Sequence, residues 1–175
     1  METSDELRNE YLETIASYPQ HMLYFIDECG LDKYLYREYG YSPKGVPIIG
    51  KISGKKFKRT NIVAAKNESG IVAPMVYGGT TDSVLFECWF EDMLLKSIPK
   101  YSVIVLDNAT FHRKKRLREL AGKAECDVVF LPPYSPELNP IENFWAWLKA
   151  RMRKILPTFD SFDDALWDCF KFKWL

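Results

Sequence analysis

The sequence has few of the residues that cross-link small domains or bind soft metals. It contains two histidines and four cysteines, Cys29, Cys88, Cys126 and Cys169. The cysteines are far apart and form no C-x-x-C pair, which argues against a disulfide framework and against a zinc knuckle. Two histidines cannot complete a soft-ligand metal cluster, so any bound metal is expected to be a hard ion held by carboxylates.

Long apolar runs are also absent from the sequence. No stretch approaches the roughly 18–20 apolar residues that span a bilayer. The first residues, METSDELRNEYLE, are acidic and lack the basic-then-apolar pattern of a signal peptide. We therefore expect a cytoplasmic protein with no membrane partner. Of its 175 residues 47% are hydrophobic, which is enough for one folded domain with a full core.

The formal net charge of zero hides a strong segregation of charge along the chain. Basic residues form three blocks, which are Lys44, Lys51, Lys55, Lys56, Lys58 and Arg59, then Arg113, Lys114, Lys115, Arg116 and Arg118, and then Lys149, Arg151, Arg153 and Lys154. Acidic residues gather near the two ends. One such block is usually a solvated helix face. Three blocks together favour a polyanionic partner such as nucleic acid.

Hydrophobic periodicity predicts strands alternating with helices in the second half of the chain. The predicted strands cover residues 22–26, 59–65, 71–77, 102–106 and 127–131, and the helices cover 4–17, 82–98, 113–124 and 141–154. Early strands joined by a short turn should be antiparallel, and later strands separated by helices should be parallel. The sequence thus predicts an α/β fold, a mixed sheet with helices on both faces.

Two details of these elements follow from local chemistry. Gly70 is expected to supply positive φ in the hairpin loop after Lys66. The 82–98 helix is expected to be capped by Thr81 or Asp82. Its buried face is expected to contain Leu85, Phe86, Trp89, Phe90, Met93 and Leu94.

Acidic residues directly follow two of the predicted strands. Tyr24-Phe-Ile runs into Asp27, and Ile104-Val-Leu runs into Asp107. Ligands of open α/β sheets gather outside the carboxyl ends of strands, so these two acids should meet there if the strands are parallel neighbours. Two adjacent carboxylates repel unless a divalent cation lies between them. Glu142, in the first turn of the last helix, is a candidate third ligand.

Each acid also has a purely structural interpretation. Asp107 can begin a turn, and Glu28 competes with Asp27 on periodicity alone. Asn139 and Glu142 fit a capping box, with Asn139 as the N-cap and Glu142 reaching back from the third helical position. The residues by themselves predict a carboxylate metal site and leave these alternatives open.

Three segments resemble the catalytic blocks of bacterial insertion-sequence transposases related to the mariner superfamily. They are Phe25-Ile-Asp-Glu28, Val105-Leu-Asp-Asn-Ala-Thr-Phe-His112 and Leu131-Pro-Pro-Tyr-Ser-Pro-Glu-Leu-Asn-Pro-Ile-Glu-Asn-Phe-Trp145. The 34 residues between Asp107 and Glu142 (142 − 107 − 1) are a spacing typical of these DDE enzymes. The resemblance implies a ribonuclease-H-like catalytic domain over residues 22–156, preceded by a linker or helical extension (1–21) and followed by a helical tail (157–175).

The resemblance also implies a chemistry and a set of partners. Asp27, Asp107 and Glu142 match the three catalytic acids, which hold two Mg²⁺ or Mn²⁺ ions for phosphoryl transfer on double-stranded DNA. Active complexes of such enzymes are homodimers, and complete members carry a helix-turn-helix region for which this chain has no room. We therefore expect either a catalytic domain that works with a separate end-binding region, or a catalytically silent remnant that binds DNA or dimerises. A junction resolvase is a weaker third reading.

Further residues near the three acids have expected roles. His112 matches a histidine common in the second block and is expected to contact DNA or to orient the site, although a plain structural role is an equal expectation. Asn108 is expected to hold Asp107 in place as a hydrogen-bond donor. Trp145 and Trp147 are expected in the core rather than against DNA bases. The basic residues are expected to contact DNA phosphates, in particular Lys55, Lys56, Lys58, Arg59, Arg113, Lys114, Lys115 and Arg116.

Overall fold

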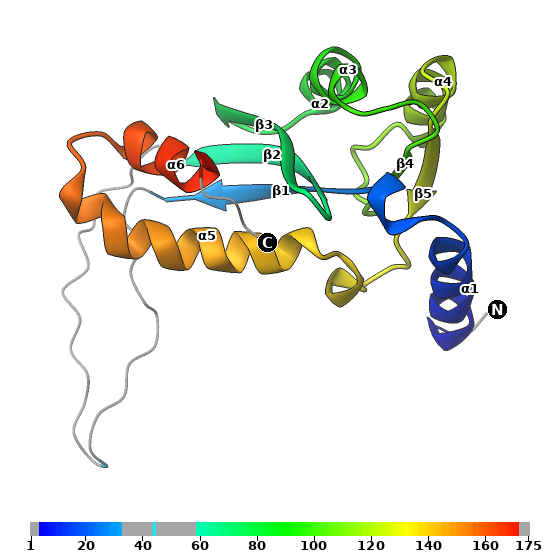
Figure 1. The fold of residues 1–175 in the computed structure, drawn as a ribbon, viewed down its shortest axis with the longest axis horizontal. Coiled ribbons are helices and arrows are strands. Elements are labelled where there is room, and N and C mark those ends of the chain that lie inside the picture. The colour runs from blue at the N-terminus through cyan, green and yellow to red at the C-terminus, as the bar shows by residue number, and fades with distance from the viewer. Residues whose placement is uncertain (1–3, 33–43, 45–58, 172–175) are drawn as a thin grey trace.

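A five-stranded mixed sheet organises the chain (Figure 1), in the strand order β3-β2-β1-β4-β5. The structure is a computed structural model and describes residues 4–32, 44 and 59–171. Strands β1, β2 and β3 pair antiparallel, while β1 with β4 and β4 with β5 pair parallel. The predicted mixed sheet is therefore confirmed. Among the described residues, no helix is both long and apolar enough to cross a membrane.

The elements follow the predicted order closely. The strands are β1 Leu23–Leu31, β2 Thr60–Asn67, β3 Gly70–Gly78, β4 Val103–Leu106 and β5 Asp127–Phe130. The helices are α1 Ser4–Ala16, α2 Ser83–Trp89, α3 Leu95–Ser97, α4 Lys114–Lys123, α5 Ile141–Ile155 and α6 Phe162–Lys171. Short 3₁₀ segments are η1 Gln20–Met22, η3 Pro136–Leu138 and η4 Leu156–Thr158, and η2 Phe90–Leu94 is π-helical. Gly70 has a φ of 131°, as the hairpin requires.

The pairing of β1 with β4 sets two acids level with each other. Phe25 pairs with Val105 in parallel register, so two residues further along each chain Asp27 stands beside Asp107. The prediction that the first strand ends before Asp27 is wrong, because β1 continues to Leu31. Its other edge explains the difference, since antiparallel pairing with β2 holds it from Phe25 to Leu31 after β4 has ended.

Helices cover both faces of the sheet (Figure 1). On one face α2, η2 and α4 pack on β1 and β4, with Phe86, Trp89, Phe90, Leu94 and Leu117 fully buried. On the other face α5 and α6 form a second core around Leu31, Ile62, Trp145, Leu148 and Leu166. Tyr11 of α1 joins a third cluster with Leu23 and Val103. Both terminal helices thus pack on the same sheet as the central elements.

The predicted single helix over 82–98 is wrong in its middle, where five residues form the π-helical segment. Leu95 donates its backbone N–H to Phe90 O, five residues back, and so the turn contains one residue more than an α-helical turn. The extra residue rotates the following side chains. Met93, expected in the core, is 37% exposed, whereas Leu94 is fully buried.

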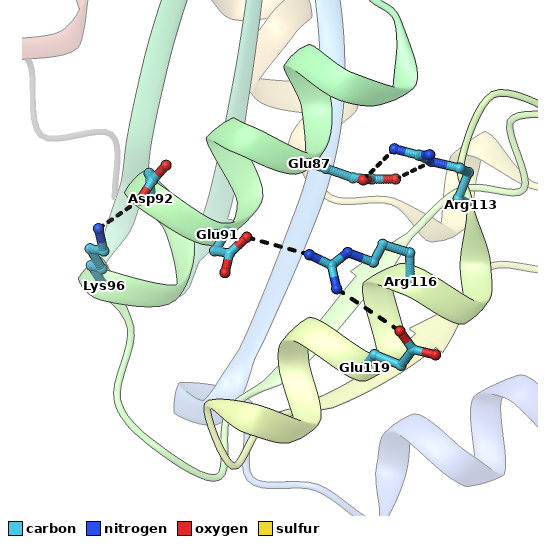
Figure 2. Close-up of polar contacts among 7 residues, drawn as sticks. All are labelled: Glu87, Glu91, Asp92, Lys96, Arg113, Arg116 and Glu119. Carbon is cyan, nitrogen blue, oxygen red and sulfur yellow. Dashed lines mark hydrogen bonds and ion pairs between the residues drawn. The ribbon is translucent and has the colours of Figure 1, made fainter.

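Ion pairs join the outer helices of one face (Figure 2). Arg113, just before α4, donates from Nε and Nη2 to the two carboxylate oxygens of Glu87 on α2, both at 2.6 Å. The Arg116 guanidinium lies 3.9 Å from Glu91 and 4.0 Å from Glu119. Because the Glu87 side chain is only 12% exposed, its pair with Arg113 is the better protected of these contacts.

Asp82→Ala should lower the free energy of unfolding by about 1 kcal/mol, because its carboxylate caps α2. Asp82 Oδ1 accepts the backbone N–H of Leu85 at 2.8 Å, which confirms the cap. Urea denaturation at neutral pH measures the loss. Asp92→Ala is the matched control, because it removes only an exposed pair with Lys96 worth less than about 0.5 kcal/mol. Equal losses in the two variants would contradict the capping role.

Candidate active site

One pocket of about 510 Å³ lies at the edge of the sheet where β4 ends. Its lining includes all three acids singled out in the sequence, which come from β1, the loop after β4 and the first turn of α5. The lining residues are Asp27, Asp107, Asn108, Ala109, Leu131, Pro132, Pro133, Tyr134, Ser135, Pro136, Asn139 and Glu142. The structure thus brings Asp27, Asp107 and Glu142 to one pocket, although 114 residues lie between Asp27 and Glu142 in the chain (142 − 27 − 1).

Asp27 is the most deeply placed of the three acids. Its pKa is raised from 3.8 to about 7, mainly by burial and in addition by repulsion from the carboxylates of Glu142 and Asp107. The indole N–H of Trp145 donates to Asp27 Oδ2 at 3.0 Å and opposes this rise. Because the charges of both other acids contribute to the pKa of Asp27, the carboxylates lie close enough to interact electrostatically.

Asp107 is held by two donors on the same oxygen. Its Oδ1 accepts the backbone N–H of Ala109 at 3.1 Å and lies 3.2 Å from His112 Nε2. The first contact is the turn expected from a purely structural reading, so turn formation and a place in the pocket occur together. The hydrogen bond from His112 is the largest of the effects that lower the Asp107 pKa.

His112 is buried between aromatic rings. Its ring centroid lies 4.3 Å from that of Phe86 and 4.2 Å from that of Phe111. With Nε2 turned to Asp107, Nδ1 is buried and has no hydrogen-bond partner. The contact with Asp107 requires a proton on Nε2, because the carboxylate oxygen can only accept a hydrogen bond.

The predicted capping box at α5 is wrong. Asn139 donates its Nδ2–H to the backbone carbonyl of Ile26 at 3.2 Å, and the start of α5 has no side-chain cap. Asn139 Oδ1 is buried without a partner. Glu142 is exposed on the first turn and lines the pocket, so its carboxylate is directed to this pocket rather than used for capping.

Asn108 ties the pocket to its neighbours. Its amide donates to the backbone carbonyl of Leu131 rather than to Asp107, and its Oδ1 accepts from Lys114 Nζ. Lys114 also lies over the Phe130 ring, 4.9 Å from the centroid, and its charge contributes to the low pKa of Asp107. The Lys114 ammonium group is therefore held in place at the rim of the pocket.

The basic residues expected to bind DNA have different surroundings. Arg113 is paired with Glu87 of α2, and Arg116 is paired with Glu91 of η2 and Glu119 of α4. Lys115 and Arg59 are exposed, and a Cβ added to Gly30 would lie 2.0 Å from the Arg59 guanidinium. Lys55, Lys56 and Lys58 lie outside the described residues.

Sequence reasoning missed two features of the site. Trp145 is buried in the core as expected, but its indole N–H also reaches Asp27. Glu28, the competing acid, does not line the pocket; its Oε1 is buried without a partner, and burial, then Asp27 and Asp107, raise its pKa to about 8. Only the alternation of side chains along a strand could have separated Glu28 from Asp27, because it places neighbours on opposite faces.

The residues of the pocket suit a hard cation. Carboxylate oxygens and the unpartnered Asn139 Oδ1 are the ligand atoms and water acceptors that Mg²⁺ prefers, whereas thiol and imidazole ligands are missing from the lining. Within the described residues, however, no three His, Cys, Asp or Glu side chains are gathered closely enough to hold a metal ion. The acids share the pocket without converging on one point.

A protein-family comparison decides the relationship of this chain. Residues 22–164 match the model of the DDE superfamily endonucleases. The chain belongs to this family. A relative from Sinorhizobium fredii (strain NBRC 101917 / NGR234), the uncharacterized protein y4pE/y4sA, is 35% identical over an alignment of 74 residues, which covers 39% of this chain and 48% of that protein.

Solved structures show the same fold. The Mos1 transposase catalytic domain, solved with raltegravir and Mg, superposes with a TM-score of 0.64 at 20% identity over 98% of this chain and 84% of that one. The Mos1 strand transfer complex gives 0.66 at 18% identity, with 98% and 55% covered. The catalytic core of BIV integrase gives 0.53 at 14% identity, with 87% and 82% covered. The ribonuclease-H-like fold expected from the sequence is confirmed, and this DDE-family chain spans about half the length of the S. fredii protein.

Asp27→Asn should stabilise the metal-free protein in EDTA as the pH rises. Because the folded pKa is about 7 and the unfolded one 3.8, the folded protein holds a proton that the unfolded chain releases in this window, and stability falls as pH rises through it. At about pH 8 the asparagine variant should unfold at a higher temperature than wild type, with a free energy of unfolding larger by roughly 1–3 kcal/mol, and this difference should shrink towards about pH 5.

Thermal unfolding at these two pH values, with Asp92→Asn as an exposed control, measures the effect. An Asp27→Asn variant that is less stable than wild type by the same amount at both pH values would show that burial does not penalise this carboxylate.

Proposed function

We propose that this chain is the catalytic domain of a transposase that cleaves DNA and transfers its strands with the help of Mg²⁺ or Mn²⁺. The observation that carries the proposal is that Asp27, Asp107 and Glu142 all line one pocket in a chain of the DDE family. In this proposal the three carboxylates hold two divalent ions. Mos1 structures solved with Mg or Mn are consistent with such a cofactor.

The two aspartates and the residues that contact them have separate roles in this proposed chemistry. The ions, when bound, would activate the attacking oxygen and stabilise the leaving oxygen of the scissile phosphate. His112 and the Ala109 N–H fix Asp107 through Oδ1, which leaves Oδ2 free to bind a cation. Trp145 Nε1 donates to Oδ2 of Asp27, and the backbone N–H of Glu28 also donates to this carboxylate. The attacking group is first water and then the freed 3′-hydroxyl of DNA, so no protein nucleophile takes part.

The spread of the carboxylates follows from their charges. Without cations, like-charged side chains repel one another, and repulsion from Glu142 and Asp107 adds to the larger effect of burial on the pKa of Asp27. Binding of divalent ions would remove this repulsion and allow the exposed Glu142 side chain to turn towards the two aspartates. The acids would then form the metal cluster that they do not form in the described structure.

DNA would approach along the rim that Lys114 occupies. Its ammonium group beside Asn108 and Phe130 is placed to contact a phosphate next to the pocket. Arg113 and Arg116 already pair with carboxylates, so we assign them mainly to joining α4 to α2. The active assembly is proposed to be a homodimer on bacterial chromosomal DNA in the cytoplasm, which acts together with an end-binding helix-turn-helix region.

Asp107→Asn and Glu142→Gln should each reduce Mg²⁺-dependent DNA cleavage by at least about 100-fold, because each variant removes one anionic ligand while preserving side-chain shape. The measurement is single-turnover cleavage and joining of terminal-repeat DNA, with any end-binding region added in trans. Glu137 lies in η3, just before α5, but does not line the pocket. Glu137→Gln is therefore the control and should cleave DNA as wild type does.

Equal activity of wild type, Asp107→Asn and Glu142→Gln would exclude this active site. A wild type that binds DNA in a salt-sensitive manner without metal-dependent cleavage would instead identify a regulatory DNA-binding remnant, and preference for branched DNA would identify a resolvase.

Lys114→Gln should lower the salt dependence of DNA binding by about one phosphate contact, whereas Arg113→Gln should leave it nearly unchanged. The reason is that Arg113 is engaged with Glu87, while Lys114 faces the pocket rim. Arg113→Gln should instead lower the unfolding temperature, because Glu87 loses its partner. Fluorescence anisotropy at several salt concentrations and thermal unfolding measure both effects. A change of slope in Arg113→Gln alone would reverse these assignments.

A further inference from the structure

Two hydrogen bonds connect the start of α5 to adjacent residues of β1. Asn139 Nδ2 donates to the Ile26 carbonyl at 3.2 Å, and Trp145 Nε1 donates to Asp27 Oδ2 at 3.0 Å. Asn139 is 4% and Trp145 2% exposed, so water cannot easily replace either bond. Both contacts are long-range, spanning 113 and 118 residues of the chain.

Glu142 lies midway between these two anchors. It follows Asn139 by three residues and precedes Trp145 by three, which corresponds to less than one helical turn on either side. Because the anchors hold to Ile26 and Asp27, the backbone that carries Glu142 is fixed relative to the first aspartate from both directions. The contacts place two acids that are remote in sequence at a constant separation.

Asn139 gives up a local role in order to make its contact. As an N-cap it would stabilise α5 by about 1 kcal/mol, yet its side chain instead reaches β1. The carbonyl that it contacts belongs to Ile26, one residue past the last β1–β4 pair, Phe25 with Val105. Asn139 therefore joins the segment before α5 to β1 just past the point where β1 stops pairing with β4.

Trp145 makes a contact that packing alone does not require. A phenylalanine could fill much of the same space in the α5 core, but only the indole N–H can donate to Asp27 Oδ2. The bond helps to fix the orientation of the carboxylate, to which the backbone N–H of Glu28 also donates. Donors of this kind orient metal-binding side chains in many proteins, and their loss commonly weakens metal binding by about 10–100-fold.

We propose that Asn139 and Trp145 are positioning residues that hold Glu142 and Asp27 in register for divalent-cation binding. The inference rests on the proposed function, since it concerns the same three acids. Neither residue touches the reacting atoms. Asn139 also lines the pocket, and its Oδ1 is buried without a hydrogen-bond partner.

Trp145→Phe should weaken Mn²⁺ binding to the free protein by about 10-fold, measured by titration with electron paramagnetic resonance detection of unbound Mn²⁺. Asn139→Ala should act in the same direction. Cleavage by either variant should be partly restored by raising the Mn²⁺ concentration, whereas the loss in Glu142→Gln should not be.

Trp89→Phe is the matched control. It also removes a buried indole hydrogen bond, from Trp89 Nε1 to Ala73 O at 2.8 Å, but on the opposite face of the sheet. It should lower thermal stability in EDTA while leaving Mn²⁺ affinity unchanged. Circular dichroism checks that each variant is folded, and Asn139→Ala provides the test if Trp145→Phe does not fold.

Two results would overturn the inference. One is unchanged Mn²⁺ affinity in both folded variants, and the other is an equal loss of affinity in Trp89→Phe, which would indicate a global effect. Wild-type protein that binds no Mn²⁺ would overturn the proposed function together with this inference. A third outcome separates the two proposals. If the wild type binds Mn²⁺ without cleaving DNA, and both variants bind Mn²⁺ more weakly, the positioning role is supported and the transposase proposal is refuted.

Discussion

The parallel pairing of β1 with β4 is the constraint on which the candidate site depends. It places the backbone of Asp27 level with that of Asp107 at an edge of the sheet where β4 has ended and β1 continues. Two carboxylates therefore lie close together in a partly buried place. Folding alone does not favour this arrangement, because burial and repulsion both raise the pKa of Asp27. A site that costs stability in the free protein is typical of binding and catalytic centres.

The surroundings of the two aspartates restrict them in complementary ways. His112, enclosed by Phe86 and Phe111, and the Ala109 N–H hold Asp107 from the α2 side of the sheet. Trp145 holds Asp27 from the α5 side. Each aspartate is thus supported by the hydrophobic layer that covers one face, and the pocket opens between the two layers. A substitution that disrupts the packing of either layer would therefore displace the aspartate that this layer supports.

The charge segregation seen in the sequence has more than one structural meaning. The second basic block divides between Arg113 and Arg116, which connect α4 to α2, and Lys114, which stands beside the pocket. Adjacent positions on one helix face different neighbours, because successive residues point in directions about 100° apart. A run of basic residues is therefore compatible with both stabilising contacts and phosphate binding.

The sequence by itself determined the type and order of the elements, the mixed sheet and the three acidic blocks. These features depend on local periodicity and on motifs carried within short segments, and Asp82, Gly70 and the apolar run of β4 all behave as their neighbours in sequence require. Only the tertiary structure decided that β1 runs on to Leu31, that the helix after Asp82 contains a π-helical turn, and that Asn139 and Trp145 reach β1. Those outcomes depend on partners 113 and 118 residues away or on packing against the sheet, and no pattern within a window of the sequence contains that information.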